Sequence, residues 1–175
     1  MSERKSYLES CKLLQSHDLL EAAETPPLPE RMPCYDDEVF GVSFFRTQLA
    51  DISLENLTLP RTFFGRSEIR NVSFRGSDLS ESSANWNDFI SVDFSSADLS
   101  RTDLRASIFE RVNFKGAVLQ DADLRRVTFR NCVFTNADFT RTKLQRSMTW
   151  LFRLTRWQRS AVDWQISAGP EPEGG

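Results

Sequence analysis

Large apolar side chains recur at every fifth position through about one hundred residues in the middle of the chain. Between Phe44 and Leu144, 20 of the 21 positions in this frame are Leu, Ile or Phe. The position two residues before each is small or β-branched in nearly every unit, and aspartate favours the position between them. A five-residue period matches neither an α-helix nor an ordinary strand. It predicts a backbone that turns after each unit and brings every fifth side chain to one interior.

Units such as 97–101 (ADLSR), 122–126 (ADLRR) and 137–141 (ADFTR) resemble the A(D/N)LXX motif of the pentapeptide-repeat family. The resemblance covers residues 42–146. It implies an all-β fold, a right-handed quadrilateral parallel β-helix of about five coils with short helices at its N- and C-terminal ends. Each coil would take about twenty residues, so side chains twenty residues apart stack in columns. Two expected inner columns are Leu54, Phe74, Phe94, Phe114, Phe134 and Leu59, Leu79, Leu99, Leu119, Phe139.

The register has one fault. Ala84 stands where Leu or Phe belongs, and Asn87 stands where a small residue belongs. We interpret this as a local bulge with Trp86 covering the gap, and a binding notch at the same place is the alternative.

The segments outside the repeats divide the chain further. We expect an N-terminal helical arm at 1–24, a Pro-rich linker at 25–41, the β-helix at 42–146, a C-terminal capping helix at 147–168 and a disordered tail at 169–175. Ser6 and Glu9 form a capping-box pattern that predicts a helix beginning near Tyr7. The linker is expected to be a stiff connector rather than a ligand of SH3- or WW-type domains.

Apolar residues near the C-terminus follow helical spacing. Trp150, Leu154, Trp157 and Trp164 share one predicted helical face. We expect this helix to cap the last coil, because an open β-helix exposes strand edges and core. Pairing with a second copy is the alternative, since the resemblance implies that some family members dimerise through their C-termini.

Composition limits the cellular compartments and the kinds of chemistry to be expected of this chain. The net charge of −3 argues for neither nucleic acid nor membrane, and there is no secretory signal pattern. Three widely spaced cysteines, Cys11, Cys34 and Cys132, suit a reducing compartment, so we expect a bacterial-type cytoplasmic protein. The single histidine, His17, lies in the arm without a nucleophile, and no cofactor or metal motif is present. The chain is therefore expected to be no enzyme and to hold no cofactor or metal.

One outer surface stands out once the register is known. The face over the inner column of Phe44, Phe64, Ala84, Leu104, Leu124 and Leu144 is basic, and we call it the Phe44 face. Apolar residues gather along its first coils. Its expected contact residues are Phe45, Phe63, Arg66, Trp86, Ile90, Arg105 and Ile108. Either the acidic N-terminal arm, which has a net charge of −5 over residues 1–41, covers this strip or a partner protein does.

The charged side chains of another outer column alternate between positive and negative. Stacked coils should turn it into a ladder of ion pairs: Arg61, Glu81, Arg101, Asp121, Arg141. This alternation bears on function, because the resemblance also implies a DNA-mimicking role in some members, which bind DNA gyrase or topoisomerase and protect it from quinolones. Such mimicry needs a continuous negative surface. The favoured function is therefore a protein–protein interaction module, acting as an adaptor, inhibitor or immunity-type protein, with gyrase binding as the alternative.

Overall fold

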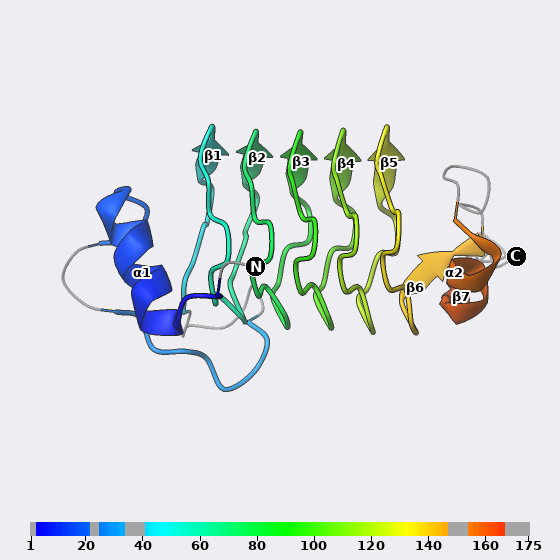
Figure 1. Ribbon diagram of the computed structural model, residues 1–175, viewed down its shortest axis with the longest axis horizontal. Helices are drawn as coiled ribbons and strands as arrows, with labels where there is room; N and C mark the ends of the chain where they lie inside the picture. Colours follow the sequence, from blue (N-terminus) through cyan, green and yellow to red (C-terminus); the bar gives the residue numbers. More distant parts are fainter. Residues whose placement is uncertain (1–2, 22–24, 34–40, 147–153, 167–175) are drawn as a thin grey trace, which may run out of the picture.

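The chain winds into a parallel β-solenoid of about six turns (Figure 1). The computed structural model describes residues 3–21, 25–33, 41–146 and 154–166. One face of the tube is a five-stranded parallel sheet in the order β1-β2-β3-β4-β5. Its strands are β1 (Gln48–Ala50), β2 (Glu68–Arg70), β3 (Asp88–Ile90), β4 (Ile108–Glu110) and β5 (Thr128–Arg130).

The twenty-residue register predicted from the sequence is confirmed. Leu49 pairs with Ile69, Ile69 with Phe89, Phe89 with Phe109 and Phe109 with Phe129. Parallel bridges with the same offset of twenty run along the other faces. A further pair, β6 (Lys143–Gln145) and β7 (Asp163–Gln165), extends one face beyond residue 146. The solenoid is thus about one turn longer than the five coils expected from the repeats.

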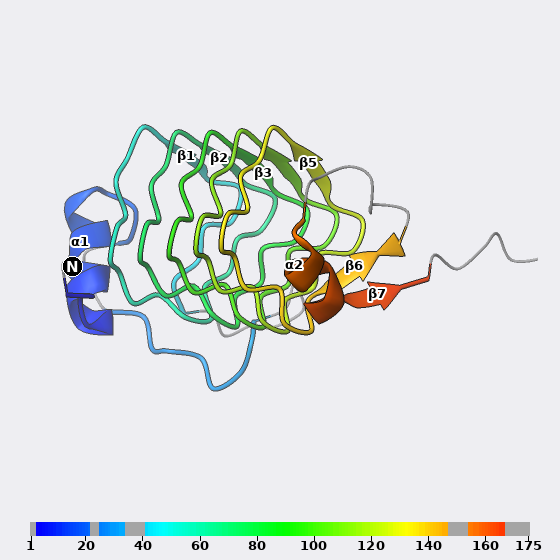
Figure 2. The same ribbon diagram turned by 45° about the vertical axis from the view of Figure 1, so that its right-hand side comes forward.

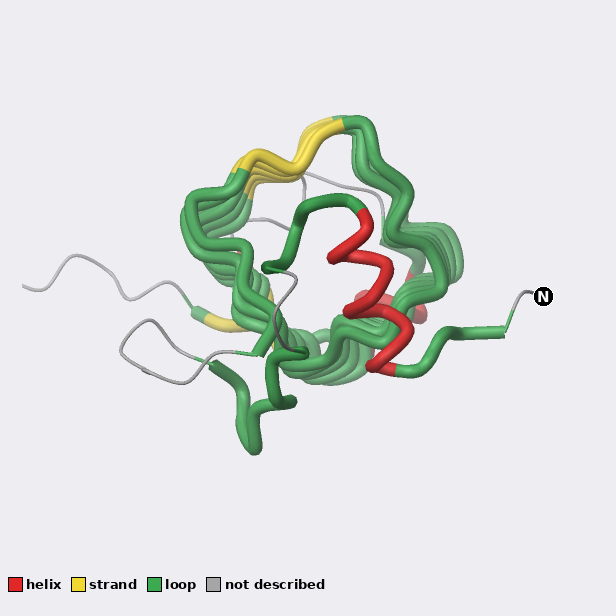
Figure 3. The backbone as a smooth tube through the Cα atoms, turned by 90° about the vertical axis from the view of Figure 1, so that its left-hand side faces the viewer, coloured by secondary structure: helices red, strands yellow, loops and turns green. Residues whose placement is uncertain are grey.

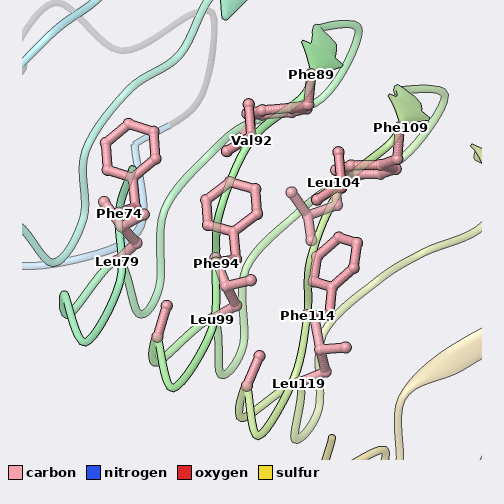
Figure 4. Packing of buried hydrophobic residues seen from close by; sticks show 14 of the residues in the cluster. Phe74, Leu79, Phe89, Val92, Phe94, Leu99, Leu104, Phe109, Phe114 and Leu119 are labelled. Carbon is pink, nitrogen blue, oxygen red and sulfur yellow. The ribbon is translucent and has the colours of Figure 1, made fainter. Parts of the chain in front are cut away.

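Phenylalanine columns fill the interior. Phe74 and Phe94 stack with ring centroids 5.5 Å apart, and Phe94 and Phe114 continue the column at 5.6 Å. Figure 4 shows these rings in line, each beside a leucine of the next inner column. Phe89 and Phe109 form a second stack at 5.0 Å, and its rings meet the first column edge to face. Ring spacings of this kind follow directly from strands about 4.8 Å apart.

Every corner of the tube is a left-handed turn. Between residues 46 and 141, each fifth residue has a positive φ: eighteen non-glycine residues together with Gly76 and Gly116. A non-glycine residue in this conformation costs about 1 kcal/mol. Hydrogen bonds offset the cost, because corner N–H groups donate to carbonyl oxygens of the next coil, as Arg46 does to Gly65 at 2.7 Å.

The predicted bulge at the register fault is wrong. Ala84 and Asn87 are both buried, and the bridges from Phe63 to Ser83 and from Ser83 to Asp103 keep the twenty-residue offset. The Asn87 side chain occupies the inward position that serine holds in the coils on either side. Trp86 covers nothing, since its side chain points outward and is 67% exposed. A small apolar cavity of about 10 Å³ lies beside Ala84, at the lower limit of the space that one water molecule needs.

The N-terminal arm closes the first end of the tube. Helix α1 (Tyr7–Ser16) begins at the capping box of Ser6 and Glu9, as predicted, and lies across the open end (Figure 3). Cys11 and Leu14 are fully buried against the first coil. Ser10 Oγ accepts a hydrogen bond from the Thr58 backbone N–H at 2.9 Å.

The described part of this arm does not lie over the Phe44 face as one of the two expectations had it, and residues 34–40 of the arm lie outside the described residues. Arg4, which precedes α1, lies 3.8 Å from Asp78 on a different face of the tube. The physical reason is that the exposed core at the first coil attracts the apolar side of α1 more strongly than exposed arginines attract its scattered acids.

A short helix closes the other end (Figure 2). Helix α2 (Arg156–Ala161) is shorter than the spacing predicted, because Asp163–Gln165 leave the helix and pair with β6. Gln158 of α2 is buried, and its Nε2 donates to the carbonyl oxygens of Phe134 at 2.8 Å and Ala137 at 3.0 Å. The helix thus satisfies acceptors of the last coil that a further complete coil would otherwise occupy.

Candidate interaction surface

The Phe44 face carries an aromatic cluster at its first coils. Phe45 is 42% exposed, and the Arg46 guanidinium lies 5.1 Å from its ring centroid. Phe63 stacks beneath it at 6.2 Å between ring centroids. Both rings lie on the backbone of Gly65, where a Cβ atom would come within 2.6 Å of each. Phe63 is consequently only 4% exposed, so its prediction as an exposed contact residue is wrong.

The other predicted contact residues are divided between two faces. Trp86, Arg66 and Arg105 are exposed along the Phe44 face and its corner. Ile90 and Ile108 belong to β3 and β4, around that corner on the sheet face, and both are half-buried. The structure therefore supports Phe45 and Trp86 as the accessible aromatic residues of the predicted set.

A groove runs from Trp86 toward the C-terminal end of the tube. It has a volume of about 370 Å³. We call it the Trp86 groove, and its lining residues are Trp86, Arg105, Ala106, Arg125, Arg126, Gln145, Gln165 and Ile166. Ala106 forms the floor because it interrupts a corner column that otherwise presents long side chains at Arg66, Trp86 and Arg126.

Two of the groove's arginines are neutralised. Arg105 Nη2 lies 2.7 Å from Asp103 Oδ2, and Arg125 Nη2 lies 2.6 Å from Asp123 Oδ2. Burial would raise the pKa of Asp103, but hydrogen bonds from Arg105 and Asn85 outweigh it and lower that pKa. The carboxylates are shielded while the guanidinia remain partly exposed. These pairs hold both arginine side chains along the wall of the groove.

Arg126 differs from its neighbours. It is exposed, and it makes no ion pair with any residue in the described ranges. Gln145 and Gln165, paired in register between β6 and β7, likewise make no side-chain hydrogen bond within those ranges. The groove therefore offers one uncompensated cation and two amides beside an exposed indole.

The sequence reasoning missed the far wall of this groove. Gln165 and Ile166 reach it only because β7 resumes the twenty-residue register after the repeats have ended. Ile166 is 81% exposed. The one signal was the spacing itself, since residues 165 and 166 continue the columns of Gln145 and Arg146.

The ion-pair ladder predicted on another face is confirmed in large part. Arg61 Nε lies 2.7 Å from Glu81, Arg101 Nη2 lies 2.7 Å from the same carboxylate, and Arg141 Nη2 lies 2.6 Å from Asp121. Hydrogen bonds from Arg61 and Arg101 lower the pKa of Glu81. This surface is a structural ladder of alternating charge, with no continuous negative strip along it.

The residues predicted as one C-terminal face do not share a face. Leu154 is buried against the last coil, whereas Trp157 of α2 points to solvent and is 80% exposed. Trp164 lies in β7, where its indole N–H donates to the Arg159 carbonyl at 2.9 Å. Trp150 lies outside the described residues, as do Cys34 and the predicted tail at 169–175.

No constellation of catalytic or metal-binding side chains appears in the described ranges. His17 is the C-cap of α1, and burial raises the pKa of the Cys132 thiol. Among these residues, no three His, Cys, Asp or Glu side chains gather as a metal site would require. No helix described here is both long and apolar enough to span a membrane.

Comparison with protein families gives two overlapping matches. A model of the pentapeptide repeat region matches residues 87–154, and a model of pentapeptide repeats in eight copies matches residues 67–105. No curated protein is significantly similar in sequence to the chain.

Solved structures agree with this fold. HetL from the cyanobacterium Nostoc sp. strain PCC 7120, a pentapeptide repeat protein involved in heterocyst differentiation regulation, aligns with a TM-score of 0.56 and 16% identity over 58% of this chain. The aligned part is 48% of HetL, so the chain spans about half of that protein. A pentapeptide repeat protein of the Arabidopsis thaliana thylakoid lumen aligns with a TM-score of 0.53 and 29% identity, over 65% of this chain and 72% of that one.

Proposed function

The chain belongs to the pentapeptide-repeat family, and from this premise we propose that it is a protein–protein interaction module without catalytic activity of its own. The Phe44 face and the Trp86 groove form its docking surface. Trp86 is the observation that carries the proposal. Its indole is 67% exposed beside a groove, and it makes no ring contact within the described residues. Exposed tryptophans next to concave surfaces are enriched among the residues that dominate protein interfaces.

The backbone conformation at Trp86 is a second observation that supports a docking surface there. Its φ is 59°, a left-handed conformation that is rare for a bulky side chain. The same conformation recurs at every corner between residues 46 and 141, but Trp86 is the only aromatic residue among the eighteen non-glycine residues that adopt it there. A short polar side chain would suit the same corner better, so a requirement other than folding favours tryptophan here.

The tube holds this docking surface in one conformation, so the surface has little conformational entropy to lose when a partner binds. Strands and bridges link successive coils along every face, and no buried side-chain N or O atom in the described part lacks a hydrogen-bond partner. A preordered surface loses less conformational entropy on association than a flexible one. An adaptor, an inhibitor and an immunity-type protein would all use this mechanism, and we place its action in a bacterial cytoplasm.

Site-specific photo-cross-linking in living cells tests this function. A benzoylphenylalanine replaces Trp86 in one variant and Arg111, which has the same left-handed turn on the far side of the sheet, in a matched control. We expect a discrete protein adduct from position 86 and none from position 111. Equal adducts from both positions, or none from position 86, would contradict a docking surface at Trp86.

A further inference from the structure

The Trp86 groove has a defined spacing between its three distinctive side chains. Trp86 and Arg126 occupy the same left-handed corner two coils apart, and Ile166, which follows β7 without that left-handed turn, lies a further two coils on in the twenty-residue register. Two coil steps correspond to about 9.6 Å along the tube. Along the groove, an indole, a guanidinium without an ion pair in the described residues and an aliphatic side chain thus follow one another in that order, at nominal backbone intervals of about 9.6 Å.

This interval matches one conformation of a peptide chain. A polyproline II helix has three residues per turn and a rise of about 3.1 Å per residue, so every third side chain points the same way at intervals of about 9.3 Å. A β-strand would present same-side residues every two positions, at intervals of about 6.6 Å, which does not match two coil steps. Seven residues of polyproline II helix therefore place three side chains opposite the three groove residues.

The charge of the groove defines the middle side chain. Asp103 and Asp123 neutralise Arg105 and Arg125, which leaves Arg126 as the uncompensated cation in the groove's described lining. A single carboxylate opposite Arg126 complements this arrangement, and the amides of Gln145 and Gln165 can donate to its neighbouring carbonyl groups. Apolar side chains suit the two ends, beside the indole of Trp86 and the exposed Ile166.

We propose that the Trp86 groove binds an acidic polyproline II segment of a partner protein, with an apolar residue, a carboxylate three positions later and a second apolar residue three positions after that. This proposal rests on the proposed interaction function and names the chemistry of the partner. A single-stranded nucleic acid fits less well, because its evenly spaced phosphates would face the Asp103 and Asp123 carboxylates.

Fluorescence anisotropy with labelled peptides tests the proposal on the full chain. The probe is Leu-Pro-Pro-Glu-Pro-Pro-Leu, and its comparison peptide carries Gln in place of Glu. We expect the Glu peptide to bind about fivefold more tightly than the Gln peptide, as a charge-assisted hydrogen bond predicts. A peptide with one Pro removed between the first Leu and Glu should lose that preference, because its carboxylate then misses Arg126.

Protein variants locate the binding site. Arg126→Gln should remove the preference for Glu over Gln, Trp86→Ala should weaken both peptides about tenfold, and Arg111→Gln should change neither. Circular dichroism and denaturation of each variant report whether it folds like the parent chain.

Several results would overturn the proposal: equal affinity for the Glu and Gln peptides, an undiminished preference in Arg126→Gln, or tighter binding of an oligothymidine probe than of the Glu peptide. Such results combined with cross-links at position 86 would reject the peptide class and leave the interaction function standing. Loss of those cross-links would reject the function itself.

Discussion

The side chain of Asn87 accepts a hydrogen bond from the backbone N–H of Ser67, one coil earlier, at 2.6 Å through Oδ1. Its Nδ2 donates to the Phe64 carbonyl at 2.7 Å. In the inward column on the opposite face of the tube, the hydroxyl of Ser77 accepts from the Leu57 N–H at 2.9 Å and donates to the Leu54 carbonyl at 2.7 Å. The amide of asparagine therefore replaces both functions of a serine hydroxyl, which explains why the coil continues without a bulge.

Substitutions at Asn87 should separate these hydrogen bonds from the size of the side chain. Asn87→Ala leaves the Ser67 N–H and the Phe64 carbonyl buried without partners, so we expect the free energy of unfolding to fall by about 2–4 kcal/mol. Asn87→Ser restores a hydroxyl and should cost less than half as much. Urea denaturation measures both, and equal losses in the two variants would contradict the assigned role.

Filling the cavity at Ala84 should stabilise the tube. Ala84→Leu restores the residue type of the repeat and adds apolar contacts with Leu104 and Phe94, which line the cavity. We expect a gain of about 1 kcal/mol, limited by the strain of fitting a larger side chain. Leu104→Ala enlarges the same cavity and should cost about 2–5 kcal/mol. Destabilisation by both substitutions would mean that Phe64 and its neighbours already occupy the space.

The interior, then, was largely predictable, because a five-residue period constrains every unit in the same way. The register, the phenylalanine columns and most of the ion-pair ladder follow from it. The burial of Phe63 was not predictable, since it depends on a glycine two residues later and on Phe45 folding over the same backbone. Asn87 was misread because residue size alone does not reveal a hydrogen-bonding role.

The C-terminal end was harder to predict for a different reason. Apolar residues between 150 and 164 satisfy a helical period over a stretch that the structure divides between α2 and β7. Helical spacing does not reveal that Trp164 can pair with Leu144 across twenty residues. For the same reason, the sequence did not reveal that Gln165 and Ile166 form the far wall of the groove.

Removing the C-terminal cap should loosen the last coil. Gln158→Leu keeps a side chain of similar size but leaves the Ala137 carbonyl without a donor and the Phe134 carbonyl with the Ala137 N–H alone, which should cost about 1–3 kcal/mol. Gln158→Glu should cost more at neutral pH, because a carboxylate would face two acceptor oxygens. Hydrogen exchange at residues 134–145 measures the effect, and unchanged protection there would contradict the capping role.

Stability should decline in acid through the Asp103 ion pair. The folded pKa of Asp103 is below the ordinary value of 3.8, so its contribution is complete above pH 3.8 and disappears as the pH falls through the folded value. Asp103→Asn should therefore lower the free energy of unfolding at pH 7 by about 1 kcal/mol and by less at pH 3. Denaturation at both pH values measures this.

Asp88→Asn is the matched control for that experiment. Asp88 is exposed and makes no ion pair in the described part of the chain. A loss from Asp103→Asn that is independent of pH would show that the carboxylate charge is not what stabilises the coil.

The alternating ladder bears on the alternative of DNA mimicry. Arg61, Arg101 and Arg141 interrupt the acidic residues of that face and pair with them. We therefore expect the purified chain to leave the supercoiling activity of DNA gyrase unchanged at equimolar concentration. Inhibition in this assay, or protection of gyrase from a quinolone, would instead favour the mimicry hypothesis.

A twenty-residue turn also determines how this molecule tolerates insertions. Adding one pentapeptide between Ala106 and Arg126 would keep the core filled but advance every later column by a quarter turn, so that Arg126 and Ile166 would move to a neighbouring side. Adding four pentapeptides would keep all columns aligned and lengthen the spacing from Trp86 by one coil step. The distance between two residues of one column can therefore change only in steps of one whole coil. The length of a ligand that contacts both residues should change in the same steps.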